Sequence, residues 1–570
     1  MPEIYGIPLD TAIPDDLTIP QFFLDSHHPR RPVRTDAPWL IEDETGRHIG
    51  FEEIRARTFG FANGLSLRYG IKEEEVVLIF SPNHVDYAPA IWATHRLGGI
   101  VSTANPSYTV GELLYQIQVV KATLIIAHSS SLQTALDAAL AAGIPSDRVI
   151  AFGESSCQPT VESIIQFGLR NELAFVERRL KKGEAKTKVA LLCFSSGTTG
   201  KPKAVTIAHY APIVNIIQMA QQIKVNENYA PWKEQRFRLG DIAAGVLPFY
   251  HIYALVVCIH LMTFCGMPLV VIPKFNFTDF LKSIERYRVT HLILVPPQIV
   301  LLCKHPAVKD YDLSGIRYLI SGAAPLSAEL VHQLTKVMPN AQIGQGYGLT
   351  ESCTSISLYP TSQKIGVPGS AGQLNPGVVA RVVKSDGSLA GYNEPGELRV
   401  KSPSLALGYW DNEPATRETF VNGWLCTGDE VIIREDNEIF IVDRLKEIMK
   451  VRGFQVAPAE LEGCILDHPD VADTCVVPVP DDYSGEVPLA FVVLHVSAAT
   501  RVEKDPREAD KVKASIMKHV TDNKIAYKCL AGGVEFIDVI PKNPSGKLLR
   551  RLLRDRARQL KAPGALKAKM

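Results

Sequence analysis

The sequence lacks any C-x-x-C pair, although it holds ten cysteines among its 570 residues. Several of these cysteines lie inside apolar runs, as in ALLCF and VVCIH. Zinc sites are built from closely spaced cysteine pairs, and disulfide frameworks are typical of short secreted chains. The cysteine pattern therefore predicts buried, reduced thiols in an intracellular protein, and it argues against a zinc site or a disulfide framework.

An excess of charge of either sign is also missing. Lys+Arg and Asp+Glu both number 61, so the formal net charge at pH 7 is 0. Nucleic-acid-binding chains usually carry a strongly basic balance, so no nucleic-acid partner is expected. The first residues, MPEIYGIPLDTAIPDD, have neither a basic start nor an apolar core, and we therefore expect no secretory signal there.

One long segment has no charged residue at all, from Ile242 to Ile272. This exceeds the roughly 20 residues that a membrane-spanning helix requires. However, glycine and proline interrupt the segment, for example at Gly245 and Pro248, and two histidines, His251 and His260, lie inside it. We therefore predict a buried strand–helix–strand unit and no transmembrane segment.

The length and the order of the elements predict the fold class. A chain this long exceeds one ordinary core, so two or more domains are expected. Expected helices cover 51–70, 87–99 and 110–120, and expected strands cover 75–83, 100–106, 122–129 and 148–153. Strands that alternate with helices are typical of parallel α/β sheets. After about residue 370, short strands around Asp-Gly and Pro-Gly turns predict a β subdomain.

The domain boundary is expected at the densely charged segment DRLKEIMK, which is followed by a separate α+β pattern. We predict a large N-terminal domain over 1–443, a connection over 444–450 and a small C-terminal domain over 451–556. The basic end of the chain, 557–570, is predicted to be a flexible tail. The fold class is therefore multidomain α/β.

The segment FSSGTTGKPK (194–203) has the composition of a phosphate-binding loop. Its glycines allow backbone N–H groups to converge on an anion, hydroxyl side chains add donors, and Lys203 adds a charge. A Walker loop requires four residues between its first glycine and Gly-Lys-Ser/Thr, but only Thr198 and Thr199 separate Gly197 from Gly200. Taken alone, the segment fits a phosphate site and a mobile surface loop equally well.

Further motifs follow in a fixed order: SGAAPL (321–326), GQGYGLTE (344–351), GWLCTGD (423–429), DRLKEIMKVRGFQVAP (443–458) and PKNPSGK (541–547). With the loop at 194–203, they resemble the adenylate-forming superfamily of acyl-CoA synthetases, luciferases and adenylation domains. PFYHIYAL (248–255), THLILVPP (290–297) and RGFQVAPAELE (452–462) resemble the 4-coumarate–CoA ligase group. The resemblance spans about residues 50–550, and it implies a small C-terminal domain that moves.

The resemblance implies an AMP-forming acid–thiol ligase. A carboxylate attacks the α-phosphorus of ATP to form an acyl-adenylate and pyrophosphate, and the thiol of coenzyme A then displaces AMP. ATP, Mg²⁺, coenzyme A and an aryl or fatty acid are the implied ligands, with no prosthetic group. Three alternatives stay open: a stand-alone enzyme that loads a carrier protein, a luciferase-like oxygenase, and a catalytically dead nucleotide-binding scaffold.

The resemblance also implies roles for individual residues. Glu351 would hold the metal, Lys446 would be the hinge, and Lys547, His251, Lys450, Gln455 and Thr350 would be catalytic. The implied ATP and AMP site consists of Ser195, Ser196, Gly197, Thr198, Thr199, Gly200, Lys203, Gly322, Ala323, Gln345, Gly346, Tyr347, Thr350, Asp429, Arg444 and Lys547. The implied coenzyme A contacts are Lys274, Arg452 and Gly453. The implied acid pocket consists of Tyr253, Val257, Ile320, Ala323, Gly348, Thr354 and Ser355.

Two features concern the acid and the location. SCTS (352–355) stands where hydroxycinnamate ligases carry Ala-Gly-Pro-Val, so a coumarate substrate does not follow from the resemblance. Substituted cinnamates, phenylacetate-like acids, fatty acids and polyketide-derived acids all stay open. The final Ala568-Lys569-Met570 resembles the peroxisomal import tripeptide, so we expect a peroxisomal location, with the import receptor as a partner, over a cytoplasmic one.

Overall fold

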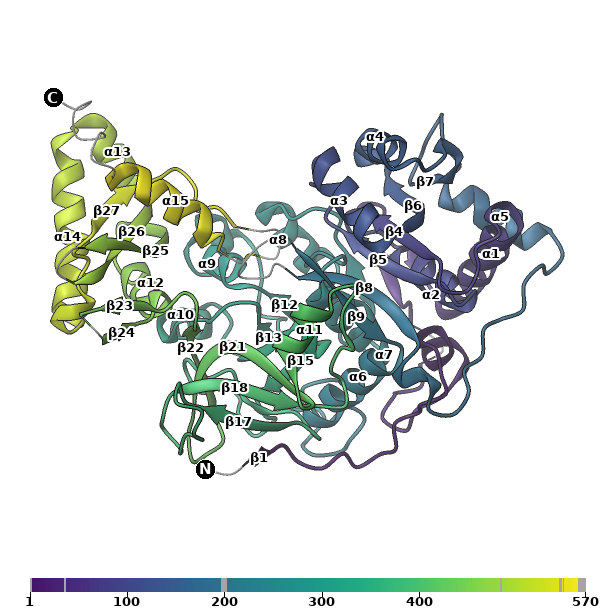
Figure 1. Cartoon of the computed structure of the whole chain (residues 1–570), viewed down its shortest axis with the longest axis horizontal. Coiled ribbons are helices and arrows are strands. Elements are labelled where there is room, and N and C mark those ends of the chain that lie inside the picture. The colour runs from purple at the N-terminus through teal and green to yellow at the C-terminus, as the bar shows by residue number, and fades with distance from the viewer. Residues whose placement is uncertain are drawn as a thin grey trace.

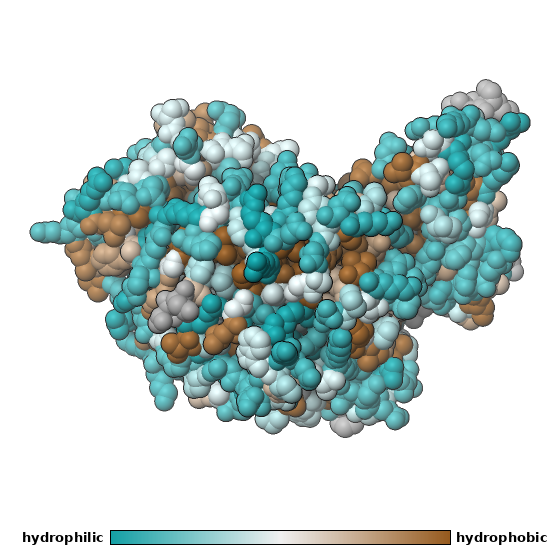
Figure 2. Space-filling view, turned by 180° about the vertical axis from the view of Figure 1, so that it is seen from behind, coloured by the Kyte–Doolittle hydropathy of each residue, from teal (hydrophilic) through white to brown (hydrophobic). Residues whose placement is uncertain are grey.

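The computed structural model describes residues 3–34, 37–195, 202–452, 454–481, 484–542, 546 and 548–561, apart from the side chains of 455 and 561. Figure 1 shows a large body that contains three sheets, and a smaller lobe at the C-terminal end that stands out from it. Figure 2 shows the same two parts from behind, with a mainly hydrophilic surface and brown apolar patches near their junction.

The first sheet of the body has the strand order β19-β9-β8-β5-β4-β6-β7. Its strands are β4 (Val76–Phe80), β5 (Ile100–Ala104), β6 (Ala122–His128), β7 (Val149–Phe152), β8 (Val189–Ser195), β9 (Lys203–Ala208) and β19 (Gly408–Tyr409). β4 pairs in parallel with β5 and β6. The parallel α/β arrangement that the sequence predicts for this region is therefore confirmed.

Helices cover both faces of this sheet, so its central strands are buried throughout. Val77 and Ile79 belong to the core beneath α1 (Phe51–Tyr69), α2 (Tyr87–Arg96) and α5 (Val161–Arg170). Val76 and Leu78 belong to the opposite core, beneath α3 (Val110–Val120) and α4 (Leu132–Ala142). The period of two in a strand explains why neighbouring residues of β4 enter different cores.

The second sheet has the order β16-β15-β14-β13-β12-β10-β11-β2-β3. Its strands are β2 (Leu40–Glu42), β3 (His48–Ile49), β10 (Ala243–Gly245), β11 (Leu269–Val271), β12 (His291–Leu294), β13 (Tyr318–Ser321), β14 (Gln342–Leu349), β15 (Thr354–Leu358) and β16 (Gln373–Leu374). The accompanying helices are α6 (Tyr210–Gln222), α7 (Met262–Phe264), α8 (Phe277–Arg286), α9 (Pro296–Lys304) and α10 (Ala328–Val337).

The uncharged segment from Ile242 to Ile272 forms β10, a π-helix over Ala254–Leu261, α7 and β11. Strands β10 and β11 pair in parallel, and the π-helix between them is fully buried. The predicted strand–helix–strand unit is therefore confirmed. No helix in the described ranges is long and apolar enough to cross a membrane.

The third sheet, the predicted β subdomain, has the order β1-β17-β18-β21-β20, and β22 pairs with β21. Its strands are β1 (Ile4–Tyr5), β17 (Val379–Val383), β18 (Gly396–Lys401), β20 (Phe420–Val421), β21 (Trp424–Ile433) and β22 (Ile439–Arg444). The helix α11 (Glu413–Thr419) precedes β20. The pairing of β21 with β22 places Asp429 opposite Arg444.

The small lobe contains a sheet of order β24-β23-β26-β25, with β27 beside β26. Its elements are β23 (Met449–Val451), β24 (Phe454–Val456), α12 (Pro458–Leu466), β25 (Val471–Asp481), β26 (Gly485–Leu494), α13 (Val496–Lys504), α14 (Arg507–Asn523), β27 (Gly533–Phe536) and α15 (Arg550–Lys561). α15 runs five residues past the predicted end of this domain, and Ala557 is fully buried. The flexible tail predicted from residue 557 therefore begins too early.

Candidate active site

A cavity of about 500 Å³ lies where the sheets of the body meet the connection to the small lobe. Many of the residues assigned from the sequence line it: Ser195, Lys203, His251, Tyr253, Val257, Ile320, Gly322, Ala323, Gly346, Tyr347, Gly348, Thr350, Glu351, Thr354, Ser355, Arg444 and Lys446. Ligand sites in α/β proteins form at the carboxyl ends of parallel strands, which is where Gly322 follows β13.

Other assigned residues do not line this cavity. Gln345, Asp429, Lys274, Lys450 and Arg452 are not among its lining residues. Outside the described residues lie Ser196, Gly197, Thr198, Thr199, Gly200, Gly453, Lys547 and the tripeptide Ala568-Lys569-Met570, together with the side chain of Gln455.

Glu351 lies at the base of the predicted phosphate loop. It belongs to a short 3₁₀ turn after β14. Its Oε1 accepts hydrogen bonds from the hydroxyls of Ser195 and Tyr409, both at 2.8 Å. Ser195 and Lys203 face each other across the β8–β9 pair, so both ends of the loop are placed beside this carboxylate. The Lys203 Nζ lies 5.0 Å from the centre of the Tyr409 ring.

A second carboxylate, Asp429, forms the opposite polar corner. Its Oδ1 lies 3.1 Å from Nε of Arg444, and its Oδ2 accepts a 2.6 Å hydrogen bond from the Tyr347 hydroxyl. Burial, followed by the charge of Asp429, raises the pKa of Tyr347 well above its ordinary value. Burial opposes the charge of Arg444, but carboxylates led by Asp429 outweigh it and raise its pKa. The sequence did not indicate the bond from Tyr347 to Asp429.

Gln345 holds the segment 321–326 in place. Its Oε1 accepts from the Leu326 backbone N–H at 2.8 Å, and its Nε2 donates to the Leu326 carbonyl at 3.3 Å. The segment approaches its neighbours closely, because a Cβ at Gly322 would lie 2.9 Å from Cζ of Tyr253. Gln345 therefore positions Gly322 and Ala323 without lining the cavity itself.

The predicted acid pocket is less polar than its sequence suggests. The Thr354 hydroxyl donates to the Ile252 carbonyl at 3.1 Å, and the Ser355 hydroxyl donates to the Ser357 carbonyl at 3.4 Å. Both hydroxyl protons are therefore hydrogen-bonded to main-chain carbonyls. Tyr253 differs, because its buried hydroxyl has no hydrogen-bond partner within the described part of the chain.

Several lining residues were missed by sequence reasoning. The apolar ones are Met219, Ile223, Phe237, Leu261, Met262, Tyr318 and Leu358, and polar ones include Thr103, Asn105, Tyr108, Tyr250, Tyr409 and Thr419. They come from elements far apart in the chain and belong to no common motif. Only Tyr250, Leu261 and Met262 carried a signal, since all three lie in the uncharged segment.

The residues assigned to coenzyme A lie elsewhere. Lys274 is exposed after β11. Lys450 and Arg452 belong to the small lobe, where their backbone N–H groups donate to Glu486 Oε2 and to the Ser484 carbonyl, both at 2.8 Å. In this arrangement of the lobes, the structure does not bring them to the cavity.

The fold and the cavity together define a class of protein. A two-lobed α/β chain, whose cavity has a carboxylate at Glu351, a guanidinium at Arg444 and an apolar extension, can bind a nucleotide beside an apolar second substrate. The family profile described as "AMP-binding enzyme" matches residues 26–410, and the one described as "AMP-binding enzyme C-terminal domain" matches residues 460–547. The chain belongs to this family, the adenylate-forming acyl-CoA ligases.

Relatives agree with this assignment. The chain is 34% identical over 565 residues to 4-coumarate–CoA ligase 5 of Oryza sativa subsp. japonica, covering 96% of this chain and 95% of that protein. It is 35% identical over 533 residues to 4-coumarate–CoA ligase 3 of Arabidopsis thaliana, covering 91% and 88%. ATP-bound MatB from Rhodopseudomonas palustris matches with a TM-score of 0.80 at 26% identity, covering 96% and 99%.

Proposed function

We propose that this protein is an ATP-dependent acyl-CoA ligase that activates an aryl or fatty acid as its adenylate and transfers the acyl group to coenzyme A. The observation that carries this proposal is one cavity that is lined by Glu351, by Arg444 and Tyr347, which both contact Asp429 just behind the wall, and by an apolar extension. A carboxylate is a poor nucleophile, so the activation depends on electrostatic stabilisation of phosphate oxygens.

The Asp429 corner and the Glu351 corner would bind different parts of ATP. The Asp429 carboxylate can accept hydrogen bonds from the ribose hydroxyls, and Arg444 holds it in place. The loop over 194–203 would grip the departing pyrophosphate, since both its ends lie beside Glu351. Lys547, which lies outside the described residues, would bridge the acid carboxylate and the α-phosphate.

The residues present fit a magnesium ion. Both hydrogen bonds that the described side chains donate to the Glu351 carboxylate fall on Oε1, so Oε2 could bind a hard cation. Mg²⁺ commonly uses one or two protein carboxylates together with substrate phosphates and water. The described residues contain no group of three or more His, Cys, Asp or Glu that would form an all-protein metal site. Magnesium would neutralise charge on the phosphates, and Glu351 would orient it.

The second half-reaction requires the small lobe to move. Lys446 lines the cavity at the connection between the lobes, so a rotation there would carry Lys450, Arg452, Gly453 and Gln455 towards it. His251, at the cavity wall, would assist the thiol, and Lys274 would contact coenzyme A. A carrier-protein acceptor and a luciferase-like oxidation remain the alternative second steps.

We also propose a peroxisomal location. Its support is the tripeptide Ala568-Lys569-Met570 alone, which matches the small–basic–apolar pattern read by an import receptor. Punctate fluorescence of a reporter that ends in these residues, abolished by Lys569→Glu, is the expected result. A uniformly cytoplasmic reporter would contradict the proposal.

The Lys547→Ala variant tests the adenylation step. We expect loss of acid-dependent ATP–pyrophosphate exchange with ATP binding largely kept, because this lysine is assigned to the reacting carboxylate and phosphate. Lys518→Ala is a matched control, since that lysine is exposed on α14 and pairs with Asp522 at 2.7 Å. Undiminished exchange in Lys547→Ala would contradict the mechanism, and no exchange in the control would point to misfolding.

A further inference from the structure

We infer that the acid is a straight-chain fatty acid of medium length, and that Phe237, held by a buried ionic network, closes the acid pocket and sets the longest chain it accepts. This inference rests on the proposed ligase function. It follows from the shape of the cavity beyond Tyr253, from its lack of free polar groups, and from the way its floor is fixed.

The far part of the cavity, which we call the well, is lined by apolar side chains. They come from α6, the π-helix with α7, the loop before β10, and strand β15: Met219, Ile223, Leu261, Met262, Phe237 and Leu358. Apolar walls favour a ligand roughly in proportion to the apolar surface that they remove from water. The well therefore selects a hydrocarbon chain.

The depth of the well follows from strand geometry. Tyr318 lines the cavity at the amino end of β13, and Gly322 lines it just after the carboxyl end. Four residues of a parallel strand span about 13 Å at about 3.3 Å each. Extended main chain covers about 1.2 Å per bond by the same measure, so this length corresponds to about eleven bonds, or an acid of about twelve carbons.

A hydroxylated aromatic acid fits the far end poorly. The hydroxyls of Thr354 and Ser355 already donate to carbonyls, and the Tyr318 ring stacks on the ring of Tyr359. A 4-hydroxyl placed there would find no free hydroxyl proton of Thr354 or Ser355 to accept, so it could only donate and its own oxygen would be buried without a donor, which weakens binding relative to an apolar chain end. The free hydroxyl of Tyr253 lies at the other end, against Gly322, where it can donate to an oxygen of the acyl-adenylate.

Phe237 forms the floor of the well at the amino ends of the strands. Its ring centre lies 5.3 Å from that of Tyr318 and 4.9 Å from that of His291. His291 and Tyr318 are paired at the first positions of β12 and β13. The floor therefore lies at the amino ends of these strands and Gly322 at their carboxyl ends, so a longer acyl chain would meet the Phe237 ring.

Both neighbours of Phe237 in the sequence, Arg236 and Arg238, are fixed by polar contacts. Arg236, which is 1% exposed, donates from Nη1 to the Tyr359 carbonyl at 3.0 Å, and its own carbonyl accepts from Nε2 of His291 at 2.9 Å. On the other side, the Arg238 backbone N–H donates to Asp241 at 2.8 Å.

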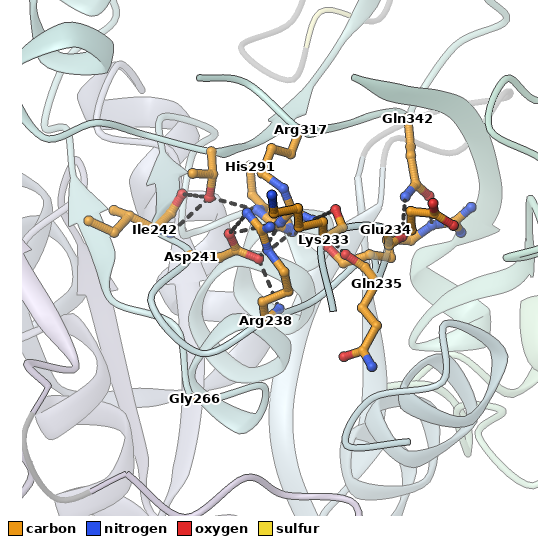
Figure 3. A network of polar contacts seen from close by, with 12 residues as sticks. Lys233, Glu234, Gln235, Arg238, Asp241, Ile242, Gly266, His291, Arg317 and Gln342 are labelled. Carbon is orange, nitrogen blue, oxygen red and sulfur yellow. Dashed lines mark hydrogen bonds and ion pairs between the residues drawn. The ribbon is translucent and has the colours of Figure 1, made fainter. Parts of the chain in front are cut away.

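Asp241 lies at the centre of this network, which Figure 3 shows between Arg238 and Arg317. Its oxygens accept two hydrogen bonds from Nη1 of Arg317, at 2.7 and 2.8 Å. Nη2 of the same guanidinium donates to the Gln235 carbonyl at 2.6 Å. Because Nη1 of Arg317 bonds both oxygens of the buried Asp241 while Nη2 bonds the main chain at Gln235, the segment that carries Phe237 is a rigid stop and Asp241 is a positioning residue.

The test is the acid specificity of the purified enzyme with the acids from butyrate to palmitate, cinnamate and 4-coumarate. We expect kcat/KM to rise about fourfold per methylene up to the length of the well and then to fall. Phe237→Ala should move the optimum to longer acids, and Met219→Phe should move it to shorter ones. Asp241→Asn should make kcat/KM fall less steeply for acids longer than the optimal one.

Phe59→Ala is the matched control, since this phenylalanine is 40% exposed on α1 and should leave the profile unchanged. Binding of acyl-sulfamoyl adenosines of the same chain lengths, read by thermal shift, repeats the comparison without turnover. A preference for 4-coumarate over every straight-chain acid, or a profile that neither Phe237→Ala nor Met219→Phe moves, would overturn the inference while leaving the ligase function intact. If none of the acids supported AMP release, that result would instead count against the proposed function.

Discussion

The two ends of the cavity are built in opposite ways. At the end proposed for the nucleotide, Asp429 and Glu351 lie beside hydroxyl and guanidinium partners, and the strand pairs β21–β22 and β8–β9 bring those partners together. At the end proposed for the acid, the cavity is lined by apolar side chains from separate elements: α6, the π-helix, β15 and the loop before β10. Charged chemistry is thus carried by short motifs, whereas the shape of the well is a result of packing.

The largest effect that would sharpen this comparison is expected at the nucleotide end. Asp429→Asn removes the charge that Arg444 faces, and breaking such a buried pair costs about 3–5 kcal/mol. We expect AMP to bind at least about 100-fold more weakly in calorimetry, with the preference among acids unchanged. Unchanged AMP affinity would show that this corner does not hold the nucleotide.

A pH titration probes the acid end. Burial lowers the pKa of His260, on the π-helix, and of His291, beneath the well, to about 4. The pKa values in the folded protein lie below the unfolded value of 6.5. The contribution of these neutral histidines to folding stability is therefore complete above about pH 6.5 and is lost as the pH falls towards 4. We expect each histidine to lower the free energy of unfolding by roughly 3 kcal/mol over that range.

Urea unfolding between pH 7 and pH 4 measures this loss. His291→Gln should reduce the dependence of the free energy of unfolding on pH. His48→Gln, at an exposed position in β3, is the matched control. An identical slope in wild type and His291→Gln would contradict the assignment of a buried, neutral imidazole beneath the well.

Glu351→Gln should produce an intermediate effect. It keeps the size of the side chain and its bond from Ser195 but removes the charge proposed to face magnesium. We expect adenylation to require about tenfold more Mg²⁺, equivalent to about 1.4 kcal/mol, and a chelator to abolish the wild-type activity. Pyrophosphate exchange measured against Mg²⁺ concentration checks this, and superimposable curves would exclude a metal role for Glu351.

Tyr253→Phe should give the smallest change. The buried hydroxyl has no partner among the described residues, so removing it should alter the free energy of unfolding by less than about 1 kcal/mol. The KM for the acid should rise a few-fold if this hydroxyl donates to the substrate. A loss of stability much larger than that, measured by urea unfolding, would show that the hydroxyl has a structural partner.

Sequence and structure agree most closely where the signals are local. The helix predicted over 51–70 ends at Gly70, which adopts the left-handed conformation at φ 58° as a helix-terminating glycine does. The strand–helix–strand unit over 242–272 was predicted from an uncharged run that glycine, proline and histidine interrupt, and the two carboxylates Glu351 and Asp429 lie in motifs of the sequence. Their residues are close in the chain or in adjacent strands, so pattern alone could locate them.

The acid well could not be predicted in this way. Phe237 has no motif around it, and its position depends on Arg317 and His291, more than fifty residues away. The polarity suggested by Thr354 and Ser355 is cancelled by bonds to carbonyls that the sequence does not reveal. Shape and satisfied polarity are properties of the packed chain, and they require coordinates.

The most direct test of the central claim, acid activation and transfer in one cavity, measures AMP and acyl-CoA together in a reaction with ATP, Mg²⁺, coenzyme A and a medium-chain fatty acid. The account predicts equal amounts of the two products, with both lost in Lys547→Ala. AMP formed without acyl-CoA for every acid tried would contradict the assignment of coenzyme A as the acceptor.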